Sequence, residues 1–385
     1  MDITLSESER AVRDGARQLL TREVTAEFMQ TAYTSDAFPA DLWRKLGGRG
    51  WLGVAVRDRA SDTVASLVHW ALVLEEMGKV ACPAPVAEHM SAVAYLAAAG
   101  PDDARLAGAA SGRLVVTIAH EDKPGSPTSA RPVGSGKAQL QGTKMLVPYA
   151  LGASHIIVVV GTGNGREYYW LDATAPGATL TPVKSLSKNQ QCLLELDNAT
   201  AELLGSYSED PRRDLIELFT LAGDAYAVGL MGTMLDISLE YVKQRIQFDQ
   251  PIGRFQAVQH RCADMAVAYS GAQSIMYNAI WLVDNDKPAA EVIALAHAYG
   301  RQAAGIVLGN AHQVHGGIGF TKEYPLHHFS RRAKVYEVSH GQASFHRERW
   351  AQLQARPSGE PSDRPPRSVQ SPASAGQPDH ALAAR

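Results

Sequence analysis

The sequence contains little cysteine, no large excess of charge of either sign and no long apolar run. Its 385 residues include three cysteines, and its formal net charge is −3. Because Cys82, Cys192 and Cys262 are scattered and odd in number, we expect buried thiols and no disulfide framework or cysteine metal site. A net charge near zero disfavours nucleic acid or an anionic membrane as the main partner, since both attract a basic face.

The chain also lacks the signals of a membrane or secreted protein. No apolar run approaches the roughly 18 residues of a membrane helix. The N-terminal stretch MDITLSESER lacks the cationic start and apolar core of a secretion signal. We therefore predict a globular, cytoplasmic protein, and a hydrophobic content of 45% is enough for sizeable cores.

Three kinds of pattern follow one another and predict an α+β, mainly α, protein. A Ser6-x-x-Glu9 capping box opens a helical region in which SLVHWALVLEEMGKV is predicted to be an amphipathic helix. Short β-branched and aromatic runs such as SHIIVVVGT then predict a central antiparallel β domain. Three long segments with apolar residues at i, i+3 and i+4 predict a four-helix-bundle-like C-terminal domain. The expected divisions are an N-terminal helical domain at 1–112, the β domain at 113–205, the bundle at 206–355 and a Pro- and Ser-rich disordered tail at 356–385.

Two short segments of the bundle each allow two interpretations. HGGIGF follows a long helix, so Gly316 and Gly317 either stop that helix or let the backbone approach a cofactor, with Gln313 one turn upstream. Its context is wrong for a dinucleotide fingerprint, which follows a strand and opens a helix. In RIQFDQPIGRFQAVQH, Arg245 either complements the dipole at a helix end or clamps a pyrophosphate.

Together the two segments form a compound signal that resembles the acyl-CoA dehydrogenase family. R-x-Q-F-x-x-P-I-G-x-F-Q-A-V-Q-H is followed by Q-V-H-G-G-x-G-F-T-x-E-Y-P, and DLWRKLGGRGWLG, LEEMGKVACPAP and LQGTKM extend the resemblance upstream. It covers nearly all of the chain except the tail. The helix, β, helix order is also the order of that family.

The resemblance implies an FAD site shared between two subunits, and hence a homodimer or homotetramer. It also implies an acyl thioester substrate, on CoA or a carrier protein, whose α-proton is taken by a base while the β-hydride passes to the flavin. An electron-transfer acceptor would then reoxidise the flavin. The residues that it assigns to FAD are Arg245, Phe248, Gln256, Gln313, Gly316 and Gly317.

The chain departs from the family where the catalytic base is expected. In many members this base is a Glu in an I-Y-E-G-T segment, and counting from the Ala-Lys of RRAK puts His340 in its place, followed by Gly341. Other members carry the base ten residues ahead of a G-L-M run, where this chain has Phe219. Glu217 and Asp224 flank that position, but they lie at other angles around a helix.

The flavin-ring segment departs as well. The family has a W-I-T run that packs on the flavin ring and hydrogen-bonds it, and this chain has Leu146-Val147-Pro148. Proline offers neither an N–H nor a hydroxyl. The T-E-P-x-x-G-S-D run is matched only loosely by IAHEDKPGSP. We expect ring contacts that differ from those of the family.

Three accounts of His340 remain open. Its imidazole is the base, with Glu337 one helical turn back to orient it or keep it charged. Alternatively, an unlike partner subunit supplies the base, or His340 only packs and Glu337, Glu217 or Asp224 is the base. We take His340 and Glu337 as the catalytic candidates, with the His340 N–H and Gly341 against the thioester carbonyl.

The predicted function is FAD-dependent α,β-dehydrogenation of an acyl thioester, in lipid or secondary metabolism. The alternatives are a non-catalytic or half-site subunit of a two-subunit acyl-CoA dehydrogenase, and a flavin oxidase on the same fold. The pairs His312 and His315, and His327 and His328, lack a Cys or acid to complete a zinc site, so we predict no metal. The basic run KEYPLHHFSRRAK sits beside acidic stretches, which disfavours nucleic acid.

Overall fold

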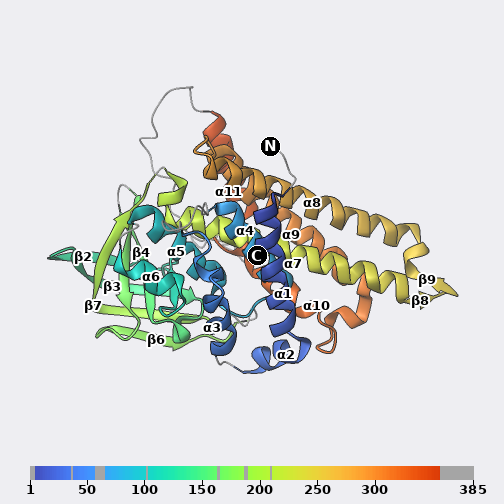
Figure 1. The fold of residues 1–385 in the computed structure, drawn as a ribbon, viewed down its shortest axis with the longest axis horizontal. Coiled ribbons are helices and arrows are strands. Elements are labelled where there is room, and N and C mark those ends of the chain that lie inside the picture. The colour runs from blue at the N-terminus through green and yellow to red at the C-terminus, as the bar shows by residue number, and fades with distance from the viewer. Residues whose placement is uncertain are drawn as a thin grey trace, which may run out of the picture.

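The computed structural model describes residues 5–35, 38–56, 66–100, 103–162, 165–185, 190–208 and 210–355 (Figure 1). The predicted disordered tail at 356–385 lies outside these residues. Helices at both ends of the chain enclose one side of a β domain, in the order that the sequence patterns predict.

The N-terminal region is helical, as predicted. Its first helix begins at the expected capping box, in which the Ser6 N–H donates to Glu9 Oε2 (2.6 Å) and the Glu9 N–H donates to Ser6 Oγ (3.2 Å). The elements are α1 (Glu7–Glu23), α2 (Ala26–Thr34), α3 (Ala40–Gly48), the 3₁₀ turn η1 (Trp51–Gly53), α4 (Leu67–Lys79), α5 (Val86–Ala99) and α6 (Ala104–Ala110).

The prediction that α4 is amphipathic is wrong, because this helix is buried on almost every side. α1, α7 and α8 all pack against it. Its acidic residues are accommodated by ion pairs: Lys79 Nζ lies 3.0 Å from Glu75 Oε1, and Arg17 Nη2 lies 2.9 Å from Glu76 Oε1. Paired acids can enter a core that unpaired acids would destabilise.

The central domain is a sheet with strand order β1-β4-β5-β7-β3-β2, and β6 pairs with β7. All neighbours are antiparallel except β1 and β4, which pair in parallel from Val116 opposite His155. The expectation of a purely antiparallel domain therefore fails at this one pair. The strands are β1 (Val116–Ala119), β2 (Ser129–Gly134), β3 (Lys137–Val147), β4 (His155–Thr162), β5 (Gly165–Asp172), β6 (Ala178–Pro182) and β7 (Cys192–Ser206).

The C-terminal domain contains the three predicted long helices, two shorter helices and a hairpin that projects from one end of the bundle (Figure 1). Within α7, one window is long and apolar enough for a membrane span, but 83% of it is buried inside the protein, as in a core helix. The elements are α7 (Leu215–Gln244), β8 (Ile246–Gln247), β9 (Gln250–Pro251), α8 (Gln256–Asp284), α9 (Ala290–His315), η5 (Gly316–Phe320), α10 (Leu326–Val338) and α11 (Ala343–Gln354).

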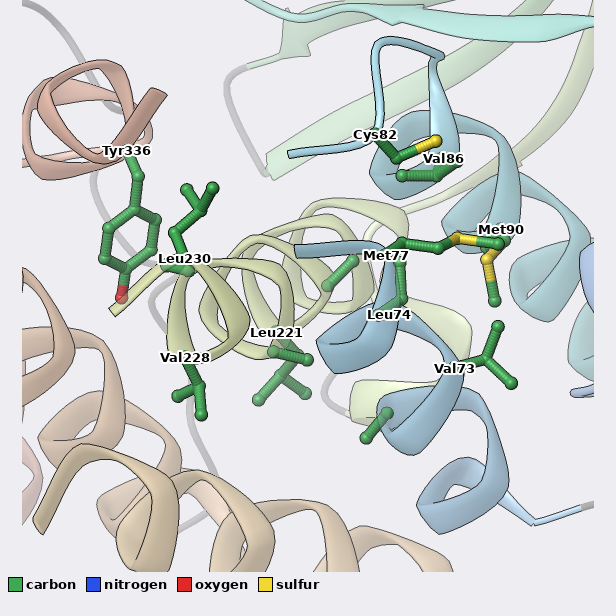
Figure 2. Packing of buried hydrophobic residues seen from close by; sticks show 14 of the residues in the cluster. Val73, Leu74, Met77, Cys82, Val86, Met90, Leu221, Val228, Leu230 and Tyr336 are labelled. Carbon is green, nitrogen blue, oxygen red and sulfur yellow. The ribbon is translucent and has the colours of Figure 1, made fainter. Parts of the chain in front are cut away.

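One hydrophobic core joins the N-terminal helices, one face of the sheet and the bundle, and Figure 2 shows side chains that α4, α5, α7 and α10 contribute to it. A pair of glycines brings α4 and α7 into direct backbone contact. A Cβ on Gly78 would lie 2.0 Å from the Tyr226 carbonyl oxygen, and one on Gly229 would lie 2.0 Å from that of Glu75. This close approach fixes α7 against the N-terminal domain.

Candidate active site

A cavity of about 130 Å³ lies where the three regions meet. Its wall is formed by the start of α5, the segment after β1, the end of β3, the first half of α7 and one side of α10. The segments that the family resemblance assigns to the flavin ring and to the base therefore line a single space. The polar or aromatic residues of the wall are Glu88, His120, Glu121, Tyr149, Gln191, Phe219, Tyr226, Arg301, Arg332, Tyr336, Ser339 and His340.

His340 lies in a tight turn that begins where α10 ends. The helix stops at Val338, and His340 and Gly341 have positive φ angles of 55° and 89°. Gly341 cannot be replaced without strain, because a Cβ there would lie 2.6 Å from the Phe345 ring. Candidate residues His340 and Gly341 are thus presented by a turn and not by a helix.

Arg301 of α9 stabilises this turn through hydrogen bonds. Its guanidinium donates to the carbonyl of Gly341 (Nε, 2.8 Å) and to that of Ser339 (Nη2, 3.1 Å). The carbonyl of His340 accepts a further hydrogen bond from His346 Nε2 (2.9 Å). The carbonyls of Ser339, His340 and Gly341 all accept hydrogen bonds from side chains. The backbone at His340 is therefore fixed independently of the His340 side chain.

The His340 ring lies among aromatic rings on the cavity wall. Its centroid is 4.2 Å from that of Phe219 and 4.6 Å from that of His120. Burial, followed by the electrostatic effects of His120 and Arg301, lowers the pKa of His340 well below its ordinary value. The imidazole is therefore neutral at pH 7, the form that can accept a proton.

The expected pairing of Glu337 with His340 on one helical face is not formed, because α10 ends between them. Glu337 instead accepts a hydrogen bond from Lys334 Nζ (3.0 Å) and lies over Gly305 of α9. It does not orient His340. The catalytic role of Glu337 stays a prediction, and no contact in the structure supports it.

The two fallback acids, Glu217 and Asp224, belong to a buried ion network. Arg349 donates to both oxygens of Glu217 (2.9 and 3.1 Å), and His297 bridges Glu217 Oε1 (3.2 Å) and Asp224. Asp224 also accepts from Tyr336 (2.7 Å) and pairs with Arg301 (3.3 Å).

Glu217 stays ionised in this network. Burial alone would raise the pKa of Glu217, but the Arg349 cation and the hydrogen bond from His297 outweigh it and lower that pKa. Burial likewise disfavours the charged form of His297, yet Asp224 and Glu217 raise its pKa. A carboxylate held this way is a poor proton acceptor.

Sequence reasoning missed the charged residues of the cavity wall, and Glu88 and Arg332 are two of them. Glu88 stands in the apolar run of α5 and is 9% exposed, and Arg332 on α10 is 5% exposed. An acid within VAEHMSAVAYLAAA is the signal that could have identified the first of them. The sequence does not identify Arg332 as buried, because it stands in a run of basic residues that is typical of a solvent-exposed surface.

The residues assigned to the flavin nucleotide gather at the far end of the bundle. The Tyr241 ring, one turn before Arg245, stacks on His315 with centroids 4.5 Å apart, which brings the end of α7 beside Gly316. Arg245, Gln256 and Gln313 are exposed. Phe248 is 86% exposed at the tip of the β8–β9 hairpin.

This surface fits a nucleotide shared with a second subunit. Gly316 has a φ of 61°, and a Cβ on Gly316 or Gly317 would meet no atom within 4 Å, so both leave open space above the backbone. Guanidinium and amide groups suit a pyrophosphate.

The segment that the family resemblance assigns to the flavin ring lies at the end of β3. The Pro148 carbonyl accepts a hydrogen bond from Thr117 Oγ1 (2.6 Å). Leu146 is 41% exposed and has a positive φ of 53°. The side chains that Leu146, Val147 and Pro148 could offer a flavin ring are apolar.

The histidine pairs lie outside any cluster of three or more candidate metal ligands in the part of the chain that the structure describes. Among the described residues there is no group of three or more His, Cys, Asp or Glu side chains arranged to hold a metal ion. His315 is already engaged, with Nδ1 near the Ala311 carbonyl (2.7 Å) and Nε2 near the Tyr324 hydroxyl (3.0 Å).

Comparison with known proteins identifies the family. The model of the acyl-CoA dehydrogenase C-terminal domain matches residues 222–353, and the N-terminal domain model matches residues 6–107. The chain belongs to the acyl-CoA dehydrogenase family. Members are FAD-dependent oxidoreductases, so the family and cofactor predictions are confirmed, as is the predicted fold class.

Relatives match almost the whole length of this chain. YngJ of Bacillus subtilis (strain 168), a probable acyl-CoA dehydrogenase, is 28% identical over 377 residues, which cover 90% of this chain and 98% of YngJ. A chain of the ChsE4-ChsE5 complex from Mycobacterium tuberculosis has a TM-score of 0.85 and 28% identity, with 93% of this chain and 100% of that chain covered. A glutaryl-CoA dehydrogenase from Mycobacterium smegmatis in complex with FADH2 shares the fold, with a TM-score of 0.80, 19% identity, and 91% and 95% of the two chains covered.

Proposed function

We propose that this chain catalyses α,β-dehydrogenation of an acyl thioester in the cavity between α5, α7, α10 and the β domain. One observation carries the proposal: the end of β3, the segment after β1 and the turn at His340 all line the same cavity. Bound FAD would supply the acceptor for the β-hydride. The thioester is carried by CoA or by a carrier protein.

In this proposal His340 takes the α-proton. Its neutral imidazole is available at pH 7, but the lowered pKa makes it a weaker base than an exposed histidine. Its backbone N–H makes no hydrogen bond to a described residue, and it can donate to the thioester carbonyl. Such a donor stabilises the negative charge that develops on the carbonyl oxygen as the proton leaves.

The second candidate function is that of a half-site subunit in a two-subunit acyl-CoA dehydrogenase. The absence of a carboxylate at both expected base positions favours this candidate. Phe219 cannot accept a proton, and His340 does so only weakly. The similar ChsE4-ChsE5 structure is a complex of two differently named chains. In this alternative an unlike family subunit provides the base, and this chain completes the flavin site.

Assembly with a second subunit follows from either candidate. Large apolar side chains are exposed around the nucleotide surface, a pattern that marks interaction sites. We propose a homodimer or homotetramer, or a pairing with an unlike family subunit, and an electron-transfer acceptor that reoxidises the flavin. A cytoplasmic location stays a prediction. The exposed apolar residues are Ile246, Phe248, Val267, Ile318 and Phe320.

Anaerobic mixing of the flavin-loaded protein with a panel of acyl-CoA thioesters tests the proposal. We expect flavin bleaching with at least one thioester, and strong slowing in His340→Ala. A homomeric protein that keeps its flavin but bleaches with no thioester would overturn the first candidate. Bleaching that appears only after a second family chain is added would support the second candidate.

A further inference from the structure

Arg332 is a buried cation without a described anion beside it. Its guanidinium donates to three phenol oxygens: Nε to Tyr33 (3.0 Å), and Nη1 to Tyr226 (3.1 Å) and Tyr149 (3.3 Å). Burial raises the pKa of Tyr149 and of Tyr226, so these phenols carry no charge at pH 7. A buried guanidinium that only neutral groups surround is costly unless an anion joins it.

One nitrogen of this guanidinium has no partner at all. Arg332 Nη2 is buried and makes no hydrogen bond to any described residue. No described carboxylate lies within ion-pair distance of Arg332. Arg332 itself lines the cavity, so the residue with the unused N–H belongs to the wall of the candidate active site.

Glu88 lines the same cavity, and the charge of Arg332 acts on its carboxyl group. Its side chain makes no ion pair with a described residue. Burial raises its pKa to about 7, and the Arg332 cation offsets this only in part. Near neutral pH the Glu88 carboxyl therefore exists in both forms, and the protonated form is a hydrogen-bond donor.

The two groups lie away from the turn at His340. Arg332, Val335, Tyr336 and Ser339 all line the cavity, so the cavity follows α10. Arg332 and Val338 are six positions apart, which corresponds to a rise of about 9 Å along a helix. A thioester held at the His340 turn would thus direct the far end of a medium-length acyl chain toward Arg332.

We propose that Arg332 and Glu88 bind a carboxylate at the distal end of the acyl group, so that the chain selects acyl thioesters carrying a second acid. The guanidinium donates its unused N–H to that carboxylate, and the protonated Glu88 carboxyl donates its O–H. The ligand supplies the anion that Arg332 lacks. This inference rests on the proposed function, because it places the thioester in the same cavity.

Binding under anaerobic conditions tests the inference separately from turnover. The flavin-loaded protein is titrated with pairs of straight-chain CoA thioesters of about six to ten carbons, which differ only in a terminal carboxylate or methyl group. We expect the carboxylate member to bind about tenfold or more tightly at one chain length. Equal binding, or preference for the methyl member, would overturn the inference. Failure of every thioester to bind would instead overturn the proposed function.

Variants of Arg332 and Glu88 test whether these two residues cause the preference for a terminal carboxylate. Arg332→Met should abolish the difference between the paired thioesters, whereas Arg331→Met, one position earlier, should retain it. If Arg332→Met does not fold, Glu88→Gln decides the question, because an amide keeps a donor and removes the competing negative charge. We expect Glu88→Gln to increase the preference at pH 8 severalfold, while Glu348→Gln on the exposed face of α11 leaves it unchanged. An unchanged preference in Glu88→Gln would contradict the assignment.

Discussion

The rings of Phe219 and His340 lie 4.2 Å apart, centroid to centroid, on the wall of one cavity. Family resemblance identifies these as the two alternative positions of the catalytic base, which are far apart in sequence. The structure brings them together on one wall, and neither carries a carboxylate. Replacement of either residue therefore acts on the same small region of the cavity.

His340→Glu should increase the rate of α-proton removal. A carboxylate at this position is a stronger base than the buried imidazole, and a well-placed general base is worth about 10²- to 10⁴-fold. The rate of flavin bleaching after anaerobic mixing with a reactive thioester measures the effect. His340→Gln, which lacks an acid, is the control, and equal rates in the two folded variants would rule out this position as a base site.

Arg301→Gln should loosen the turn that presents His340. The change removes the donors to the Ser339 and Gly341 carbonyls and leaves Asp224 without one cationic partner. Removing one partner of a buried ion pair costs about 3–5 kcal/mol. Denaturant unfolding monitored by tryptophan fluorescence measures the loss. Arg347→Gln on exposed α11 should change stability little, and similar values for both variants would show that Arg301 does not support the turn.

The stability of the N-terminal region should depend on pH through His89. Its Nδ1 accepts from the Val116 N–H (3.1 Å), and its Nε2 donates to the Ala109 carbonyl (2.9 Å), so the native state needs the neutral ring. Burial lowers its pKa to about 4 from an ordinary value of 6.5. The unfolded chain then binds a proton that the native protein excludes.

The free energy of unfolding should therefore fall as the pH drops from 6.5 toward 4, with His89 contributing about 3 kcal/mol of the loss. Thermal unfolding at several pH values measures it. His89→Gln can make both hydrogen bonds without titrating, so it should show a smaller loss over that range. A parallel pH profile in the two proteins would exclude His89 as a source.

Gly229→Ala should severely destabilise the protein, since the new Cβ would lie 2.0 Å from the Glu75 carbonyl oxygen, and only a shift between α4 and α7 could relieve the clash. We expect a loss of about 3 kcal/mol or more, measured by denaturant unfolding. Gly48→Ala is the matched control. Its Cβ would meet no atom within 4 Å, so it should be neutral or stabilising by up to about 1 kcal/mol.

Much of the fold follows from local signals in the sequence. The capping box at Ser6, the change from helical to β patterns near residue 113 and the three long bundle helices all depend on residues close together in the chain. The burial of α4 could not be predicted in this way. It depends on helices before and after it, which the period of its own apolar residues does not reveal.

The candidate site was only partly predictable for the same reason. Counting along a motif assigns His340 to the family's base position, and this assignment stays a prediction. The turn that presents His340 is fixed by Arg301, which is 39 positions away in the printed sequence. Glu337 looked close to His340 only if the helix continued. The charge balance of Arg332 and Glu88 depends on what lies across the cavity, which sequence spacing does not specify.

The hydrogen bonds from Arg301 to the carbonyls on either side of His340 have an evolutionary consequence. Since the main chain there is anchored from another helix, the side chain can be exchanged without rebuilding the loop. After a gene duplication, a change in one codon would be enough to deprive one copy of its proton acceptor while the architecture survives. Pairs of unlike chains, one reactive and one supporting, could arise from a common ancestor by that route.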